Sequence, residues 1–228
     1  MSTIKKGYAK ARIEVAQAKK DWAALSEEVR DRFVRDLAAR PSVESLAKLI
    51  KVWPECLARS FGPSSESLLM LIAESDREDC VAFFLGDKGK RIDAFQKDVN
   101  GRTALARLNR EKAPKIWHLL VAYMGDQLRL QEKQGGYSPN QDLSRAINKN
   151  NYEETYVIAK AFPGIAFPRN RRHRWIEWAE EHGKKRAASA LNEVLADDLA
   201  KHIQEGLRRP PTTAIGRLEE FFGFHPKP

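Results

Sequence analysis

The chain has 228 residues, and 42% of them are hydrophobic, which is enough apolar material for a folded core and argues against disorder. No apolar run approaches the roughly 18–20 residues that span a bilayer, and the charged first twenty residues lack the apolar segment of a secretory signal. The net charge of +9 suits an anionic partner, but it equally suits a soluble basic protein without one.

The N-terminal segment, residues 1–25, is expected to be a basic capping helix. Residues 4–24 are rich in alanine and lysine and carry a thin apolar stripe. Ser26 then supplies a side chain suited to the N-cap of a helix, and Glu27 and Glu28 supply carboxylates that favour the positive end of the helix dipole. The next helix is therefore predicted to begin near Glu27.

A sixteen-residue pattern then recurs five times. Each copy has an apolar pair three residues apart and a further apolar residue twelve positions later, and successive copies begin 35, 36, 38 and 33 residues apart. A period in the thirties with helical spacing inside each copy indicates helix pairs that must stack, because one pair cannot bury its own apolar face. The positions are Val34/Leu37/Leu49, Leu69/Ile72/Phe84, Leu105/Leu108/Leu120, Leu143/Ala146/Ile158 and Ile176/Ala179/Leu191.

Links rich in proline and glycine separate the copies, and such clusters end helices and turn the chain. They fall within residues 50–65, 86–101 and 125–139, and a fourth contains Pro163, Gly164 and Pro168. No segment alternates with period two for long enough to predict a strand. The fold class predicted is therefore all-α.

The C-terminal segment, residues 196–228, is expected to be a helix and a tail that packs on the last repeat. The helical pattern continues to about Gly206, and the Arg-Arg-Pro-Pro run at 208–211 breaks it. Thr212 or Thr213 can cap a final short helix whose apolar residues lie on one face. The alternative is a peptide that docks into a partner. The apolar residues are Ile215, Leu218, Phe221 and Phe222.

Two copies contain longer recognisable motifs. The third reads GRTALARL at residues 101–108 and continues to the apolar pairs 116–117 and 120–121, and the fifth reads AEEHG at residues 179–183. These motifs resemble the ankyrin repeat, whose consensus is roughly G-x-T-P-L-H-x-A-A-x-x-G-H-x-E-I-V-x-x-L-L. The resemblance covers about residues 30–195, although no copy has the proline of T-P-L-H. A generic α-solenoid built from other helical hairpins is the rival.

The resemblance implies an ankyrin-like helical solenoid of about five helix pairs, with repeats over residues 26–195 and capping helices at both ends. The turn between the two helices of a pair favours a residue that tolerates positive φ. Asp76, Asn150 and Gly183 fall at that turn and tolerate this conformation, whereas Pro41 and Lys112 fall there in the other two copies and suit it less well. The resemblance also implies a groove lined by one inner-helix residue from each copy. These residues are Asp36, Leu71, Arg107, Arg145 and Trp178.

No residues indicate catalysis, so we expect a protein that is not an enzyme and has no cofactor, metal or small-molecule substrate. The five histidines are scattered, and none is paired with another histidine or a cysteine at metal-ligand spacing. No nucleophile elbow, phosphate-binding glycine loop or zinc-protease motif occurs. The two cysteines, Cys56 and Cys80, provide no disulfide framework and suit a reducing cytoplasm.

The sharpest local feature is a basic patch over residues 169–186, where seven cations face three glutamates for a net charge of +4. The ankyrin resemblance implies that its first cluster forms a finger loop and its second the turn of the fifth repeat. Trp175 and Trp178 lie between the clusters. Arginine beside tryptophan is typical of binding hot spots on proteins, and equally of phosphate contacts with base stacking.

We therefore expect a partner protein with an acidic surface, and nucleic acid is the alternative. The basic run can also be read as a nuclear-import signal, and the plainest reading is a solvated terminal repeat with Trp175 in the core. No membrane partner is expected. The predicted partner-binding residues are Arg169, Arg171, Arg172, Arg174, Trp178, Lys184 and Lys185 in the patch, with Arg107 and Arg145 in the groove.

Overall fold

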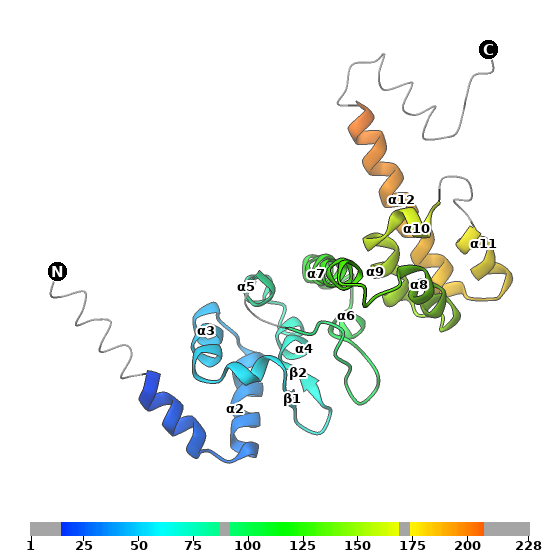
Figure 1. Ribbon diagram of the computed structural model, residues 1–228. Coiled ribbons are helices and arrows are strands. Elements are labelled where there is room, and N and C mark those ends of the chain that lie inside the picture. Colours follow the sequence, from blue (N-terminus) through cyan, green and yellow to red (C-terminus); the bar gives the residue numbers. More distant parts are fainter. Residues whose placement is uncertain (1–14, 87–91, 169–173, 208–228) are drawn as a thin grey trace, which may run out of the picture. The chain divides into compact units, whose positions relative to one another are not determined.

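The protein is predominantly helical in a computed structural model, which describes residues 15–86, 92–168 and 174–207 (Figure 1). The chain divides into two compact units, Met1–Met124 and Gly125–Pro228, and each unit is described by itself. No helix among the described residues is both long enough and apolar enough to cross a membrane.

The first unit begins with a helix over residues 15–24, which is the described part of the predicted capping helix. The helices and strands that follow are α2 (Glu27–Ala39), α3 (Val43–Val52), η1 (Pro54–Leu57), β1 (Ser60–Phe61), β2 (Glu66–Ser67), α4 (Leu68–Ala73), α5 (Glu78–Gly86), α6 (Ala104–Arg107) and the start of α7 (Pro114–Lys133). The strands pair antiparallel, with Ser60 opposite Ser67 and Phe61 opposite Glu66.

Hydroxyl side chains cap the starts of α2, α3, α4 and α6. Ser26 accepts a hydrogen bond from the backbone N–H of Val29, so the prediction that α2 begins near Glu27 is confirmed. Ser42 does the same for α3, Ser67 for α4 and Thr103 for α6. Each cap satisfies a backbone donor that the first turn of a helix leaves without an internal acceptor.

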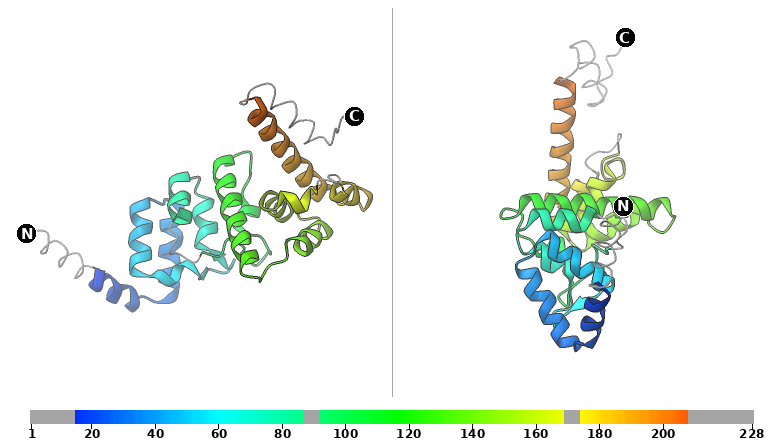
Figure 2. Two further views of the ribbon diagram at one scale, coloured as in Figure 1. Left: turned by 45° about the horizontal axis from the view of Figure 1, so that its top comes forward. Right: turned by 90° about the vertical axis from the view of Figure 1, so that its left-hand side faces the viewer.

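Corresponding helices of successive pairs pack on one another in the first unit. Helix α4 lies between α2 and α6, and α5 packs against α3. Figure 2 shows these helices lying side by side. First helices therefore contact first helices and second helices contact second helices, as expected when one helix pair covers the apolar face of the next.

The second unit contains the end of α7, α8 (Pro139–Asn148), α9 (Tyr152–Ala161), α10 (Pro163–Ala166), α11 (Arg174–Glu181) and α12 (Lys185–Leu207). Helices α8 and α9 form one pair and α11 and α12 another, and α12 also packs along α9. The prediction that the helical pattern runs on to about Gly206 is confirmed by α12. The final tail, residues 208–228, lies outside the described residues.

Three of the five turn positions have the positive φ that the pattern favours, and the other two, Pro41 and Lys112, do not. The backbone φ is 57° at Asp76, 52° at Asn150 and 66° at Gly183. Aspartate and asparagine tolerate this left-handed conformation better than other residues with side chains, and glycine adopts it freely. The repeat pattern also coincides with the core, since every pattern position except Leu37 and Leu108 is buried.

One predicted boundary is wrong. We expected a link to begin at Gly125, but this residue lies inside α7, which continues to Lys133. A Cβ added at Gly125 would lie 3.5 Å from the Cβ of Ala161. The glycine therefore permits close approach of α7 to the end of α9, which explains a glycine in mid-helix.

Candidate partner-binding surface

The described part of the predicted basic patch centres on Trp178 and His182 at the end of α11. Their rings stack with centroids 4.2 Å apart and an angle of 16° between the ring planes. The Nδ1 atom of His182 lies 2.8 Å from the carbonyl oxygen of Trp178. A carbonyl only accepts hydrogen bonds, so Nδ1 must donate and carry the proton. The two rings therefore form a rigid aromatic stack on the protein surface.

Arg174 lies one helical turn before Trp178, next to the aromatic stack. Arg174, Trp178 and His182 follow each other at four-residue spacing, which places them along one side of the helix. Arg174 is exposed, and its guanidinium carbon lies 5.7 Å from the centroid of the Trp175 ring, within the range of a cation–π contact. The other side of α11 buries Ile176.

The second basic cluster lies at the end of the turn from α11 and the start of α12, and Asn150 holds the start of that helix in place. The side-chain oxygen of Asn150 accepts hydrogen bonds from the backbone N–H groups of Arg186 and Ala187, at 3.0 and 3.2 Å. The side chain of Arg186 also pairs with a carboxylate of α9. Lys184 is half-buried and Lys185 is exposed. The lysines are therefore presented from a fixed backbone, which reduces the entropy lost on binding.

The charge of this surface is less one-sided in its described part than over the whole predicted patch. Residues 174–186 carry four cations, and three glutamates, Glu177, Glu180 and Glu181, lie exposed among them. Most of the predicted excess of positive charge comes from Arg169, Arg171 and Arg172, which lie outside the described residues. The described part is thus an aromatic surface with mixed charges.

The two arginines predicted in the groove have different environments. Arg145, on α8, is exposed over 61% of its side chain and pairs with Asp142, one turn before it. Arg107, at the end of α6, is exposed over only 10% of its side chain. Arg107 binds carboxylates of its own chain, so a partner would have to compete with them for its N–H donors.

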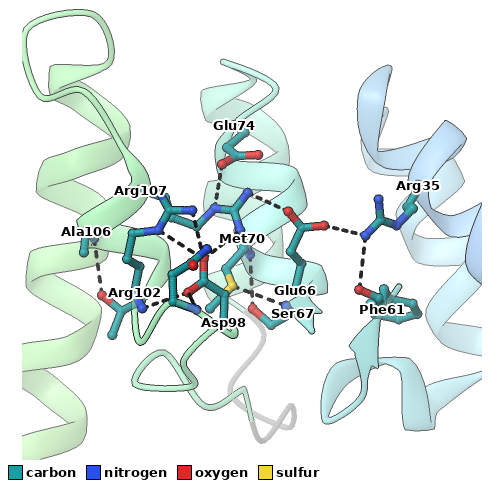
Figure 3. A network of polar contacts seen from close by, with 12 residues as sticks. Arg35, Phe61, Glu66, Ser67, Met70, Glu74, Asp98, Arg102, Ala106 and Arg107 are labelled. Carbon is teal, nitrogen blue, oxygen red and sulfur yellow. Dashed lines mark hydrogen bonds and ion pairs between the residues drawn. The ribbon is translucent and has the colours of Figure 1, made fainter. Parts of the chain in front are cut away.

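Arg107 is the centre of a buried polar network (Figure 3). It donates to Glu66 at 2.6 Å, to Glu74 at 2.7 Å and to Asp98 at 3.1 Å. Burial alone would lower the pKa of Arg107, but the hydrogen bonds to Glu74 and Glu66 outweigh it and raise the pKa. The second oxygen of Glu66 accepts a hydrogen bond from Arg35 at 2.6 Å, which links α2 to the network.

Asp98 anchors the loop that leads into α6. Its fully buried carboxylate accepts hydrogen bonds from the backbone N–H groups of Arg102 and Asn100, both at 2.9 Å. These bonds, with the Arg102 N–H as the largest contribution, lower the pKa of Asp98 although burial opposes the shift. Gly101 completes the turn with a φ of 74°. The network therefore fixes the loop and α6 in place.

The sequence contains little that would reveal this network. Arg107 and Glu66 lie 41 residues apart, and neither belongs to a local motif that marks the other as its partner. The ankyrin resemblance implies an inner-helix position for Arg107, but it does not specify whether a carboxylate lies beside this residue.

The described residues hold no metal-binding cluster, and their two thiols are buried. No group of three or more His, Cys, Asp or Glu side chains among them is arranged to hold a metal ion. Both cysteines are buried, and burial raises the pKa of the Cys80 thiol, which disfavours the reactive thiolate. Comparison of the chain with protein-family models, curated proteins and solved structures finds no match.

Proposed function

We propose that this protein is a non-catalytic module that binds an acidic surface of another protein. The observation that carries the proposal is the row of exposed Arg174, half-buried Trp178 and exposed His182 beside Lys184 and Lys185. Tryptophan and arginine are over-represented among the residues that dominate binding energy. A Trp ring already stacked and held by its neighbour loses little further freedom when a partner covers it.

The proposed architecture is an ankyrin-like solenoid of about five helix pairs. Three features support it: the repeat period, the contacts between corresponding helices in the first unit, and the positive φ at three corresponding turns. In such an array the turns and loops project from a continuous helical scaffold, and this suits a stoichiometric inhibitor, an adaptor or an effector. The reducing setting indicated by the cysteines favours a cytoplasmic role.

The proposal assigns a direct role to the arginines of the sequence cluster 169–174. Changing Arg169, Arg171, Arg172 and Arg174 together to Glu should abolish binding, because the partner's carboxylates would then meet like charges. The matched control changes four exposed lysines of the first unit to Glu, which gives the same change in net charge. These lysines are Lys48, Lys51, Lys112 and Lys115.

The experiment has two steps. The tagged protein first retrieves its partner from the native host for identification by mass spectrometry, and titration calorimetry then measures the affinity of each variant for the purified partner. Melting curves check that all variants are folded. Loss of binding in the arginine variant alone is expected. Full binding by the arginine variant would contradict the proposed site. An equal loss of affinity in both variants would show that only net charge matters.

Nucleic acid is the second candidate, favoured by one observation. An aromatic platform flanked by lysines and arginines is the composition that binds single strands through base stacking and phosphate contacts. Fluorescence anisotropy with a labelled single-stranded oligonucleotide tests it. If phosphates are bound, the logarithm of affinity falls linearly with the logarithm of salt concentration, and Trp178→Ala weakens binding further. No binding at low salt would eliminate this candidate.

A further inference from the structure

Helix α12 is longer than the helix beside it. The hydroxyl of Tyr152 donates to Glu193, and the hydroxyl of Tyr156 donates to Asp197 at 3.0 Å. Both contacts join residues 41 apart, so α9 and α12 run parallel. Helix α9 ends at Ala161, which this offset places level with about residue 202, since both helices rise equally per residue. The last turns of α12 extend past α9 (Figures 1 and 2).

Between Asn192 and Ile203, one side of α12 carries no charged residue and is largely exposed among the described residues. Asn192, Ala196, Leu199 and Ile203 follow one another at steps of four, three and four residues, so they form a single stripe. Asn192 and Ala196 are exposed, Leu199 is half-buried, and Ile203 is exposed over 46% of its surface. Alternating steps of three and four are the spacing of a seam between two packed helices.

Two charged residues of α12 within this span, Glu193 and Asp197, lie on another side of the helix, facing α9. Glu193 and Asp197 accept hydrogen bonds from tyrosines of α9, and Lys160 pairs with Asp197 at 2.9 Å. A helix packed on the uncharged stripe would therefore bury apolar side chains without displacing these contacts, and would desolvate no charge.

We propose that residues 212–222 of the same chain form a short helix that packs antiparallel on this stripe. These residues lie outside the described ones, and the sequence identifies them as the occupant. Pro210 and Pro211 follow the end of α12 closely and cannot continue it, so the chain turns there. Thr212 or Thr213 can then cap a new helix. Its apolar residues are Ile215, Leu218, Phe221 and Phe222.

The proposed helix over residues 212–222 is long enough to cover the stripe on α12. Because both helices rise about 1.5 Å per residue, an antiparallel return from Leu207 to Thr212 brings Leu218 between Leu199 and Ile203. The phenyl rings of Phe221 and Phe222 then come level with Ala196, whose small side chain leaves room for them. The tail thus covers the apolar stripe that α12 otherwise exposes.

Cysteine cross-linking in the full chain tests this register. The variant with Ile203→Cys and Leu218→Cys should form an intramolecular disulfide on mild oxidation. The matched control pairs Leu218→Cys with Gln204→Cys, because Gln204 is the next residue but lies about 100° further round the helix. Rapid closure of the first pair alone is expected. Equal closure of both pairs, no closure, or an intermolecular disulfide that indicates a second copy would each overturn the proposal.

Limited trypsin digestion provides a second measurement that needs no cysteines. Arg217 lies within the proposed helix, so cleavage after it should be slow in the native chain. Ile203→Ser should accelerate that cleavage by weakening the contact, whereas Gln204→Ser should leave it unchanged. Fast cleavage in the native chain, or the same rate in both variants, would show that the tail does not pack on this stripe.

Discussion

Arg107 and Glu66 form a buried ion pair, with their side chains each exposed over only 10% and the nitrogen and oxygen 2.6 Å apart. The opposite oxygen of Glu66 binds Arg35 on α2 at the same distance. One carboxylate thus joins the first helices of the first and third helix pairs through the strand β2. This link depends on geometry that only arginine, with its planar set of N–H donors, can supply.

The first prediction compares the two arginines expected in the groove. Arg107→Ala should lower the free energy of unfolding by roughly 3–5 kcal/mol, because it removes the buried cation that the carboxylates of Glu66 and Asp98 share. Arg145→Ala should cost about 0–1 kcal/mol, since Arg145 is an exposed residue paired within its own helix. Urea unfolding measures both. Similarly small losses of unfolding free energy in both variants would show that the network does not stabilise the position of α6.

A second prediction concerns Gly62, which has a φ of 61°. A Cβ at this position would overlap the Arg35 guanidinium, so Gly62→Ala must shift the group that binds Glu66. Gly101→Ala is the control, because its φ is 74° but no atom lies within 4 Å of an added Cβ. Gly101→Ala should cost about 1–2 kcal/mol for the left-handed backbone alone. Gly62→Ala should cost more, and equal losses would contradict the crowding.

The local features of the fold were predictable because they depend on near neighbours. Apolar spacing identified the buried positions of five helix pairs, Ser26 identified a helix start, and residue type identified the positive-φ turns. Each inference uses residues within about one helical period. The ankyrin-like arrangement of the helix pairs is a proposal.

Long-range contacts were not predictable in the same way. Nothing near Arg107 in the chain indicates Glu66, and nothing near Gly125 indicates Ala161, because each pair meets only when separate helices pack. The candidate surface could be predicted only in part. Arg174, Trp178, Lys184 and Lys185 could be chosen from composition, whereas the stacking of His182 on Trp178 and the anchoring of the turn by Asn150 emerged from the structure.

A third prediction concerns Thr155, a fully buried residue of α9. Among the described residues, its hydroxyl oxygen has no hydrogen-bond partner. Thr155→Val replaces the hydroxyl by a methyl group of similar size, so it should raise the free energy of unfolding by about 1–2 kcal/mol. Thr155→Ala should not stabilise, because it opens a cavity. Calorimetric melting distinguishes the two, and destabilisation by valine would point to a buried water bound at the hydroxyl.

The last prediction is a pH dependence that arises from Asp98. Hydrogen bonds from the backbone N–H groups of Arg102 and Asn100 lower the pKa of this carboxyl in the folded state. The unfolded chain therefore binds the proton more readily, and ionised Asp98 stabilises the fold fully above its unfolded pKa of about 3.9. This contribution is lost as the pH falls from there through the lower folded pKa. Asp98→Asn cannot titrate, so its stability should fall less steeply between about pH 5 and 2. Urea unfolding at each pH measures the slope for both proteins, whose other acidic groups are the same. Equal acid slopes would show that Asp98 has the same pKa in the folded and unfolded chains.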